Sequence, residues 1–200
     1  MTATVLEQVM LEIRALGFDF ETIDDLRDSS KRYSEALPVL LKWLPLATDP
    51  TDKDAIIRTL TQSWAKKQAL DPLIEEFRNL PFEGDLAPKR WVVGNALDVL
   101  WDDSRFDDLA ELLLDSKYGG DRQMLAWGMG KSRRPEATAV LLEVSEDPEI
   151  GGHAVRSLAK LADPQARPAL EVALNHNEAW VRNYAKKGLA HLDVERGASA

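Results

Sequence analysis

The sequence predicts an all-α fold, a solenoid of about five helix pairs with an N-terminal helical cap. The first observation behind this prediction is an internal repeat, because AWVRNYAKKGLAHL at 179–192 repeats the pattern of EIGGHAVRSLAKL at 149–161. Apolar residues also recur at helical spacing along the chain, and the alternation typical of strands is missing. Short turns rich in Asp, Pro, Asn and Gly separate the helical segments. Helix pairs of this kind bury their apolar faces by stacking, which predicts a repeat array.

The positions that the two copies share are those expected to pack. The aligned pairs are Val181 with Ile150, Ala185 with Ala154, Leu189 with Leu158, Ala190 with Ala159 and Leu192 with Leu161. The residues between them differ freely. A repeated apolar seam with a varied surface predicts a common core and a face that differs from repeat to repeat.

Two short helices are predicted at the N-terminus. The apolar residues between Val5 and Leu16 recur at helical spacing and end at Gly17, and residues 20–28 form a second, shorter segment. Because a terminal repeat must cover the open end of an array, residues 1–32 are expected to act as a cap.

Residues 33–192 are expected to form the five helix pairs of a single domain that spans residues 1–200. The predicted first members lie near 33–47, 68–80, 105–116, 135–146 and 164–175. The predicted second members lie near 53–67, 89–103, 121–133, 148–162 and 178–192. The remaining residues, 193–200, are expected to form a flexible tail.

Composition excludes several classes of protein. With 44% hydrophobic residues, the 200-residue chain can bury a core. It has no cysteine, which excludes disulfides, thiolate metal sites and cysteine nucleophiles. The first residues carry Glu7 and Glu12 and lack a basic start, so they do not resemble a signal peptide, and no apolar run is long enough to span a membrane. These features predict a soluble, cytoplasmic protein with no membrane partner.

Three apparent catalytic or metal-binding motifs have simpler explanations. The segment GMGKS at 128–132 resembles the end of a phosphate loop, but Leu125 stands where a glycine is needed and no strand precedes it. The three histidines lack a metal-ligand spacing, and the acidic run at 102–108 fits a helix N-terminus with Asp103 and Ser104 at the cap. No serine has a credible base beside it. No catalytic residue, metal or cofactor is therefore predicted, and the chain is expected not to be an enzyme.

Charge is distributed unevenly between the two rows of helices. The whole chain carries −9, yet the predicted second helices together carry a net positive charge. A basic inner row would attract an anion or an acidic partner, because the acidic outer row screens it only in part. Alternatively, these Lys and Arg residues simply complement helix C-termini.

One stripe of the predicted second helices combines aromatic rings, cations and amides. In the last helix, Trp180, Tyr184, Lys187 and His191 share a face away from the apolar seam. The same register in earlier repeats gives Trp91, Asn95, Asp98, Trp127, Lys131, His153, Arg156 and Lys160. Such surfaces are used in protein interfaces and in nucleic-acid grooves. The alternative is that tryptophans pack between repeats, which is favoured for Trp64 and Trp101, whereas Trp127 and Trp180 are expected to be exposed.

The last two repeats share turn and anchor residues with a known family. These are the turns Asp147-Pro148 and Asp163-Pro164, the pair Val181-Arg182, and two Ala-x-x-x-Leu pairs, Ala154/Leu158 and Ala185/Leu189, on the packing side of their helices. They resemble bacterial HEAT repeats of the short type found in phycobilisome lyase subunits, and the resemblance extends over residues 33–192. It implies a right-handed α-solenoid whose second helices line a concave surface where ligands bind. Because HEAT motifs specify a scaffold, they do not by themselves specify a function.

Three functions are compatible with these residues. The leading hypothesis is a non-enzymatic scaffold or adaptor that binds a partner protein or peptide on its concave face, including regulatory and immunity-type binders. The alternative is a HEAT-like DNA glycosylase acting on alkylated bases with Asp98 as its acid, although the acidity of the chain opposes nucleic-acid binding. The third is a lyase-like chaperone for bilin chromophores, which rests on the repeat subtype alone.

Overall fold

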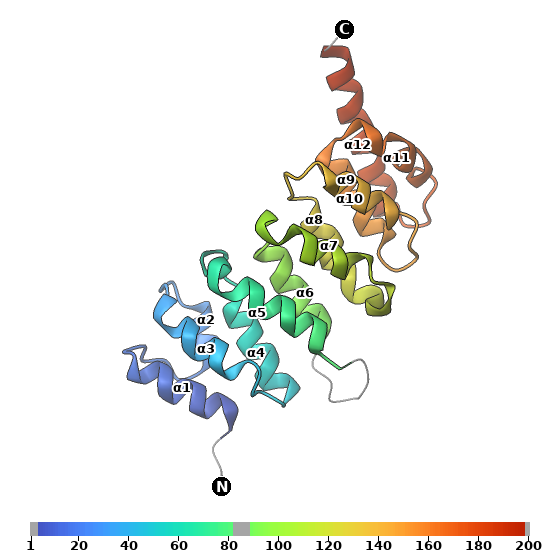
Figure 1. Ribbon diagram of the computed structural model, residues 1–200. Helices are drawn as coiled ribbons and strands as arrows, with labels where there is room; N and C mark the ends of the chain where they lie inside the picture. Colours follow the sequence, from blue (N-terminus) through green and yellow to red (C-terminus); the bar gives the residue numbers. More distant parts are fainter. Residues whose placement is uncertain (1–3, 82–88, 199–200) are drawn as a thin grey trace. The chain divides into compact units, whose positions relative to one another are not determined.

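The computed structural model describes residues 4–81 and 89–198, and its regular structure is helical throughout (Figure 1). No strand occurs in these two ranges, which confirms the predicted all-α fold. Contacts along the chain divide it into two compact units, residues 1–100 (unit 1) and 101–200 (unit 2). Within the described ranges, no helix combines the length and the hydrophobicity needed to cross a lipid bilayer.

Unit 1 consists of two N-terminal helices followed by two helix pairs. Its helices are α1 (Val5–Ala15), α2 (Ile23–Asp28), α3 (Leu37–Trp43), α4 (Pro50–Leu60), α5 (Lys66–Asn79) and α6 (Arg90–Val99), and single 3-10 turns, η1 (Ser34–Ala36) and η2 (Ser63–Ala65), precede α3 and α5. Thr4 and Thr22 begin α1 and α2 with capping boxes. Helix α4 contacts α2, α3 and α6, and its Ile56, Ile57 and Leu60 are fully buried. This helix is therefore the centre of the unit.

Unit 2 consists of three helix pairs. Its elements are η3 (Asp103–Arg105), α7 (Phe106–Leu114), η4 (Ser116–Arg122), α8 (Gln123–Met129), α9 (Glu136–Glu143), α10 (Gly151–Leu161), η5 (Pro164–Ala166), α11 (Arg167–Ala173) and α12 (Ala179–Ala198). Helix α10 contacts α8, α9, α11 and α12. Its Ala154 and Leu158 are fully buried, as are Val181 and Ala185 of α12. Most of the repeated apolar seam thus lies in the core of this unit, but Ala190, which was expected to pack, is exposed, and Leu161 and Leu189 are half-buried.

Several predicted helix boundaries were wrong. The helices predicted at 89–103 and 121–133 end at Val99 and Met129, and α12 continues to Ala198, through most of the predicted tail. The helix predicted at 53–67 ends at Leu60, because Thr61 and Gln62 leave the helical region and the Thr61 hydroxyl donates to the Ile57 carbonyl over 2.7 Å. Lys66 and Lys67 consequently begin α5, so the second helices are less basic than predicted. Similarly, the predicted cap at 103–104 lies one residue earlier, since the Asp102 carboxylate accepts from the Ser104 amide at 2.9 Å.

Trp64 and Trp101 lie in connections rather than in second helices. Trp64 belongs to η2 and packs edge-on against Tyr33, with ring centroids 5.0 Å apart. Trp101 follows α6 and is 5% exposed, and its indole N–H donates to the Asp103 carboxylate at 3.1 Å. Trp101 is buried, as expected, whereas Trp64 is only half-buried, and the assignment of both to second helices was wrong.

The backbone of Ala162, which ends α10, adopts the left-handed conformation (φ 55°, ψ 27°) that favours glycine. We expect Ala162→Gly to raise the free energy of unfolding by about 0.5–1 kcal/mol, because glycine adopts this conformation without steric cost. Urea denaturation measures the change. Ala190→Gly, at an exposed position inside α12, is the matched control and is expected to lower stability by a similar amount. Destabilisation of both variants alike would contradict the prediction.

Candidate partner-binding surface

Four aromatic rings from three helices form a continuous series in unit 2. Trp127 of α8 contacts His153 of α10 with ring centroids 6.0 Å apart, and His153 contacts Trp180 of α12 at 5.3 Å. Trp180 contacts Tyr184 one helical turn later at 6.4 Å. The series forms because α10 packs against both α8 and α12, so that His153 reaches a tryptophan on either side. We call Trp127, His153, Trp180 and Tyr184 the aromatic row.

Two cations accompany the aromatic row. The guanidinium carbon of Arg156 lies 3.0 Å from the Trp127 ring centroid and 5.3 Å from that of Tyr184. The ammonium nitrogen of Lys187 lies 5.6 Å from the Tyr184 centroid. Nε and Nη1 of Arg156 are buried without a hydrogen-bond acceptor. Arg156 is therefore held by cation–π contacts rather than by an ion pair.

The aromatic row is partly exposed. Trp180 is 36% exposed, whereas Trp127, His153, Arg156 and Tyr184 are half-buried. Burial, together with the positive charge of Arg156, lowers the pKa of His153 below its usual value of 6.5. Its imidazole is consequently neutral at pH 7. The surface presents uncharged rings flanked by cations.

Gly152 makes room for Trp180 on α10. A Cβ atom at this position would lie 2.8 Å from Cγ2 of Val181 and 2.9 Å from Cη2 of Trp180. The absent side chain lets the indole lie directly on α10, next to His153. Sequence analysis did not identify this residue, although the Gly-Gly pair at the start of the helix was a possible signal.

Three further predicted residues of unit 2 also lie at its surface. Lys160 of α10 and His191 of α12 are exposed, and so is Lys131, which follows α8. Together with the aromatic row, Arg156 and Lys187, they complete the set predicted for this part of the chain.

The predicted residues of unit 1 have separate environments. Trp91 is 43% exposed and lies under Arg58, whose guanidinium carbon is 5.6 Å from the ring centroid. Asn95 is half-buried and lines a cleft beside α4. Both residues belong to α6, but neither is part of the aromatic row.

The prediction for Asp98 was wrong. Its side chain is buried, whereas the prediction placed it at the surface. Both α4 and α5 pack against α6, so most of the helix circumference is covered. The surface stripe follows steps of four residues, Trp91, Asn95 and Val99, whereas the prediction took a step of three from Asn95 to Asp98. The side chain proposed as the acid in the glycosylase alternative is therefore not accessible from the surface.

The site combines ring stacking with positive charge. Over the described ranges, no cluster of three or more His, Asp or Glu side chains could hold a metal ion. The neutral His153 is enclosed by two tryptophans and stands beside a cation.

A family model described as HEAT repeats matches residues 106–190. This part of the chain, somewhat under half of its length, is similar to HEAT repeats. The match contains the whole aromatic row together with Arg156 and Lys187, so the candidate surface lies within the matched residues. This finding confirms the predicted resemblance over residues 106–190, which is part of the range 33–192 for which it was expected.

A curated relative matches part of the chain. Phycocyanobilin lyase subunit alpha of Synechococcus elongatus (strain ATCC 33912 / PCC 7942 / FACHB-805) is 35% identical over 86 residues. The match covers 38% of this chain and 32% of that protein. The similarity thus spans about a third of the length of the relative.

Proposed function

We propose that this helical-repeat chain is a non-enzymatic scaffold that binds a partner protein through the aromatic row. The observation that carries the proposal is the contact of four rings from three successive second helices with two cations at their side. Aromatic residues and arginine supply most of the binding energy at protein interfaces. Because the flanking charges are positive, the partner is expected to present acidic groups around an apolar contact.

Pull-down from lysate of the source organism tests the proposal, with the tagged chain compared with Trp180→Ala/Lys187→Ala. We expect the recovered amount of one or more partner proteins to be at least about tenfold lower with the variant than with the wild type, because the change removes a ring and a cation of the surface. Recovered protein and nucleic acid are measured separately at low and moderate salt.

The matched control is Val172→Ala/Lys186→Ala, which also shortens one exposed apolar residue and one exposed lysine of unit 2. Its interactions are expected to equal those of the wild type. If Trp180→Ala/Lys187→Ala keeps every interaction, the proposed surface is wrong. Recovery of nucleic acid that fades steeply with salt would instead indicate a nucleic-acid binder.

A second candidate function, lyase-like handling of a bilin chromophore, is favoured by the similarity to phycocyanobilin lyase subunit alpha. A conjugated chromophore could stack on the exposed part of the aromatic row. Titration of phycocyanobilin against the same two double variants distinguishes the functions. A change in its visible absorption with the wild type and the control, lost in Trp180→Ala/Lys187→Ala, would support the second candidate.

A further inference from the structure

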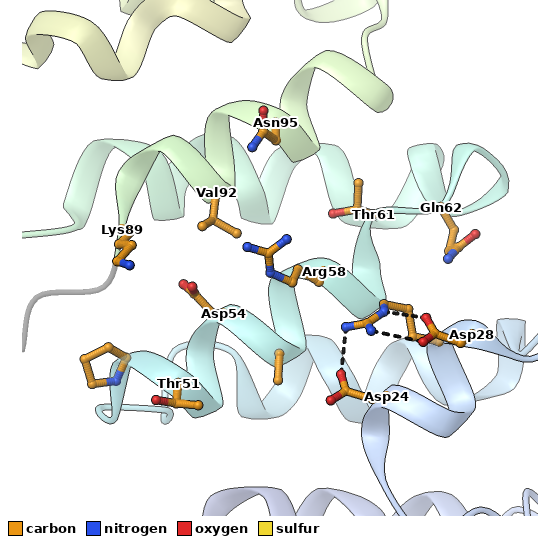
Figure 2. A pocket seen from close by; sticks show the side chains of 13 residues that line it. Asp24, Asp28, Thr51, Asp54, Arg58, Thr61, Gln62, Lys89, Val92 and Asn95 are labelled. Atoms are coloured by element: carbon orange, nitrogen blue, oxygen red, sulfur yellow. Dashed lines mark hydrogen bonds and ion pairs between the residues drawn. The ribbon is translucent and has the colours of Figure 1, made fainter.

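Unit 1 contains a cleft that the proposed function does not use. The cleft has a volume of about 910 Å³ and is lined by residues of α2, α4 and α6 and of the segments next to them (Figure 2). Its size lies within the range of ligand-binding cavities. None of its lining residues belongs to unit 2, so the cleft can be tested independently of the aromatic row.

One end of the cleft has its charges satisfied within the protein. Arg27 forms ion pairs with Asp24 at 2.7 Å and with Asp28 at 2.8 Å, as the dashed lines in Figure 2 show. The hydroxyl of Thr61 donates to the Ile57 carbonyl. These groups can shape a ligand site, but they do not need a ligand to complete their hydrogen bonding.

The other end holds one poorly satisfied polar atom, a carboxylate oxygen of Asp54. Oδ1 of Asp54 is buried and has no hydrogen-bond donor. Burial raises the pKa of this carboxyl, and the charges of Arg58 and Lys89 only partly offset that effect. Figure 2 shows Asp54 between Lys89 and Arg58, with Asn95 on the facing helix α6. A buried carboxylate oxygen without a donor costs free energy that a bound donor would recover.

The arrangement of these groups selects among classes of ligand. A carboxylate or phosphate would bring negative charge close to Asp54, whereas an ammonium group would bring positive charge close to Arg58 and Lys89. Three carboxylates and three basic side chains line the whole cleft, so neither sign dominates. A neutral group that both donates and accepts avoids both repulsions. The peptide amide is such a group, and an extended chain repeats it along its length.

We propose that this cleft binds an extended peptide segment through its main chain, with an amide N–H donated to Asp54 and carbonyl oxygens accepting from Arg58 and Asn95. The side chains of such a segment would contribute less to binding than its main chain, because α6 offers them little apolar surface. Val92 is the large apolar residue of this helix in the lining. The proposal predicts binding that depends on peptide amides more than on peptide charge.

The test uses a phage-displayed library of random peptides of about twelve residues, selected on the full chain. Enriched sequences are synthesised with a fluorescent label and titrated against the wild type, Asp54→Ala and Asn95→Ala, with polarisation as the readout. We expect affinity to fall about tenfold or more in both variants, since each removes a hydrogen bond that involves a buried or charged group. Asp54→Ala removes an unsatisfied buried oxygen, so circular dichroism should show an intact fold.

Two further measurements distinguish recognition of the peptide main chain from recognition of peptide charge. N-methylation of single backbone nitrogens in a selected peptide is expected to abolish binding at one or more positions, whereas conversion of its Asp and Glu residues to Asn and Gln should have little effect. Trp180→Ala, in unit 2, should bind the peptides as the wild type does, so failure here is distinguishable from failure of the aromatic-row proposal. Selection of no peptide whose binding needs Asp54, or binding that follows peptide acidity instead of its amides, would overturn the inference.

Discussion

Arg122→Met is expected to lower the free energy of unfolding of unit 2 by about 3–5 kcal/mol, because it breaks a buried ion pair by removing one partner. Arg122 is 2% exposed and precedes α8. Its guanidinium donates to the carbonyls of Gly119 at 2.9 Å and Leu113 at 3.1 Å, and to the Asp147 carboxylate at 2.7 Å. Methionine fills a similar volume but leaves all three acceptors without their donor.

Urea denaturation followed by tryptophan fluorescence measures this loss. Arg167→Met is the control, since it makes the same substitution in a more exposed ion pair with Asp193 and is expected to cost less than about 1 kcal/mol. If the two variants lose equal stability, the network around Arg122 does not contribute as the structure indicates.

The same network has a defined dependence on pH. Burial raises the pKa of Asp147, but the backbone amides of Glu149 and Ile150 and the Arg122 guanidinium together lower it below the ordinary value of 3.8. A carboxyl with a lowered folded-state pKa adds stability above its unfolded pKa and loses it as the pH falls through the folded pKa. The difference in stability between the wild type and Arg122→Met should therefore shrink below about pH 4.

Much of the fold could be predicted because the two C-terminal repeats share their apolar spacing. Val181, Ala185 and Leu192 are buried in α12 as expected, and the polar stripe of the same helix lies outside the core. The break after Leu60 was missed because neither glycine nor proline marks it, and it depends on a threonine hydroxyl that bonds to the preceding turn. A side-chain hydrogen bond of this kind leaves no periodic signal in the sequence.

The candidate site was predictable in part for a related reason. Trp180 and Tyr184 share a helix face at a spacing of four, and the repeat placed His153 and Arg156 on the equivalent face of α10. Asp98 was misplaced because only three-dimensional packing decides whether a helix exposes a wide or a narrow stripe. The cleft around Asp54 was missed because it requires α2 to pack against α4, a contact outside the repeated pattern.

Gly188→Ala is expected to destabilise unit 2 by about 1–3 kcal/mol, although alanine is the better helix former by about 1 kcal/mol. Gly188 is buried in α12 against α10. A Cβ atom there would lie 2.8 Å from Cβ and 2.9 Å from Cα of Ala159, and 2.9 Å from Cδ1 of Leu170. Because one of these atoms belongs to the backbone, relief requires the two helices to move apart. Thermal unfolding measures the loss, and Gly120→Ala, where the nearest atoms are 3.9 Å away, is the control.

The close approach of α12 to α10 at Gly188 also positions the aromatic row, since Trp180 meets His153 and Tyr184 meets Arg156 across these same two helices. Gly188→Ala should therefore change the near-ultraviolet circular dichroism of the tryptophans and weaken partner binding, even though Gly188 itself lies in the core. Ala159→Gly in the same chain removes the closest clash and should restore part of both properties. Loss of stability with unchanged spectrum and binding would show that the row is positioned by its own ring contacts, independently of the helix spacing.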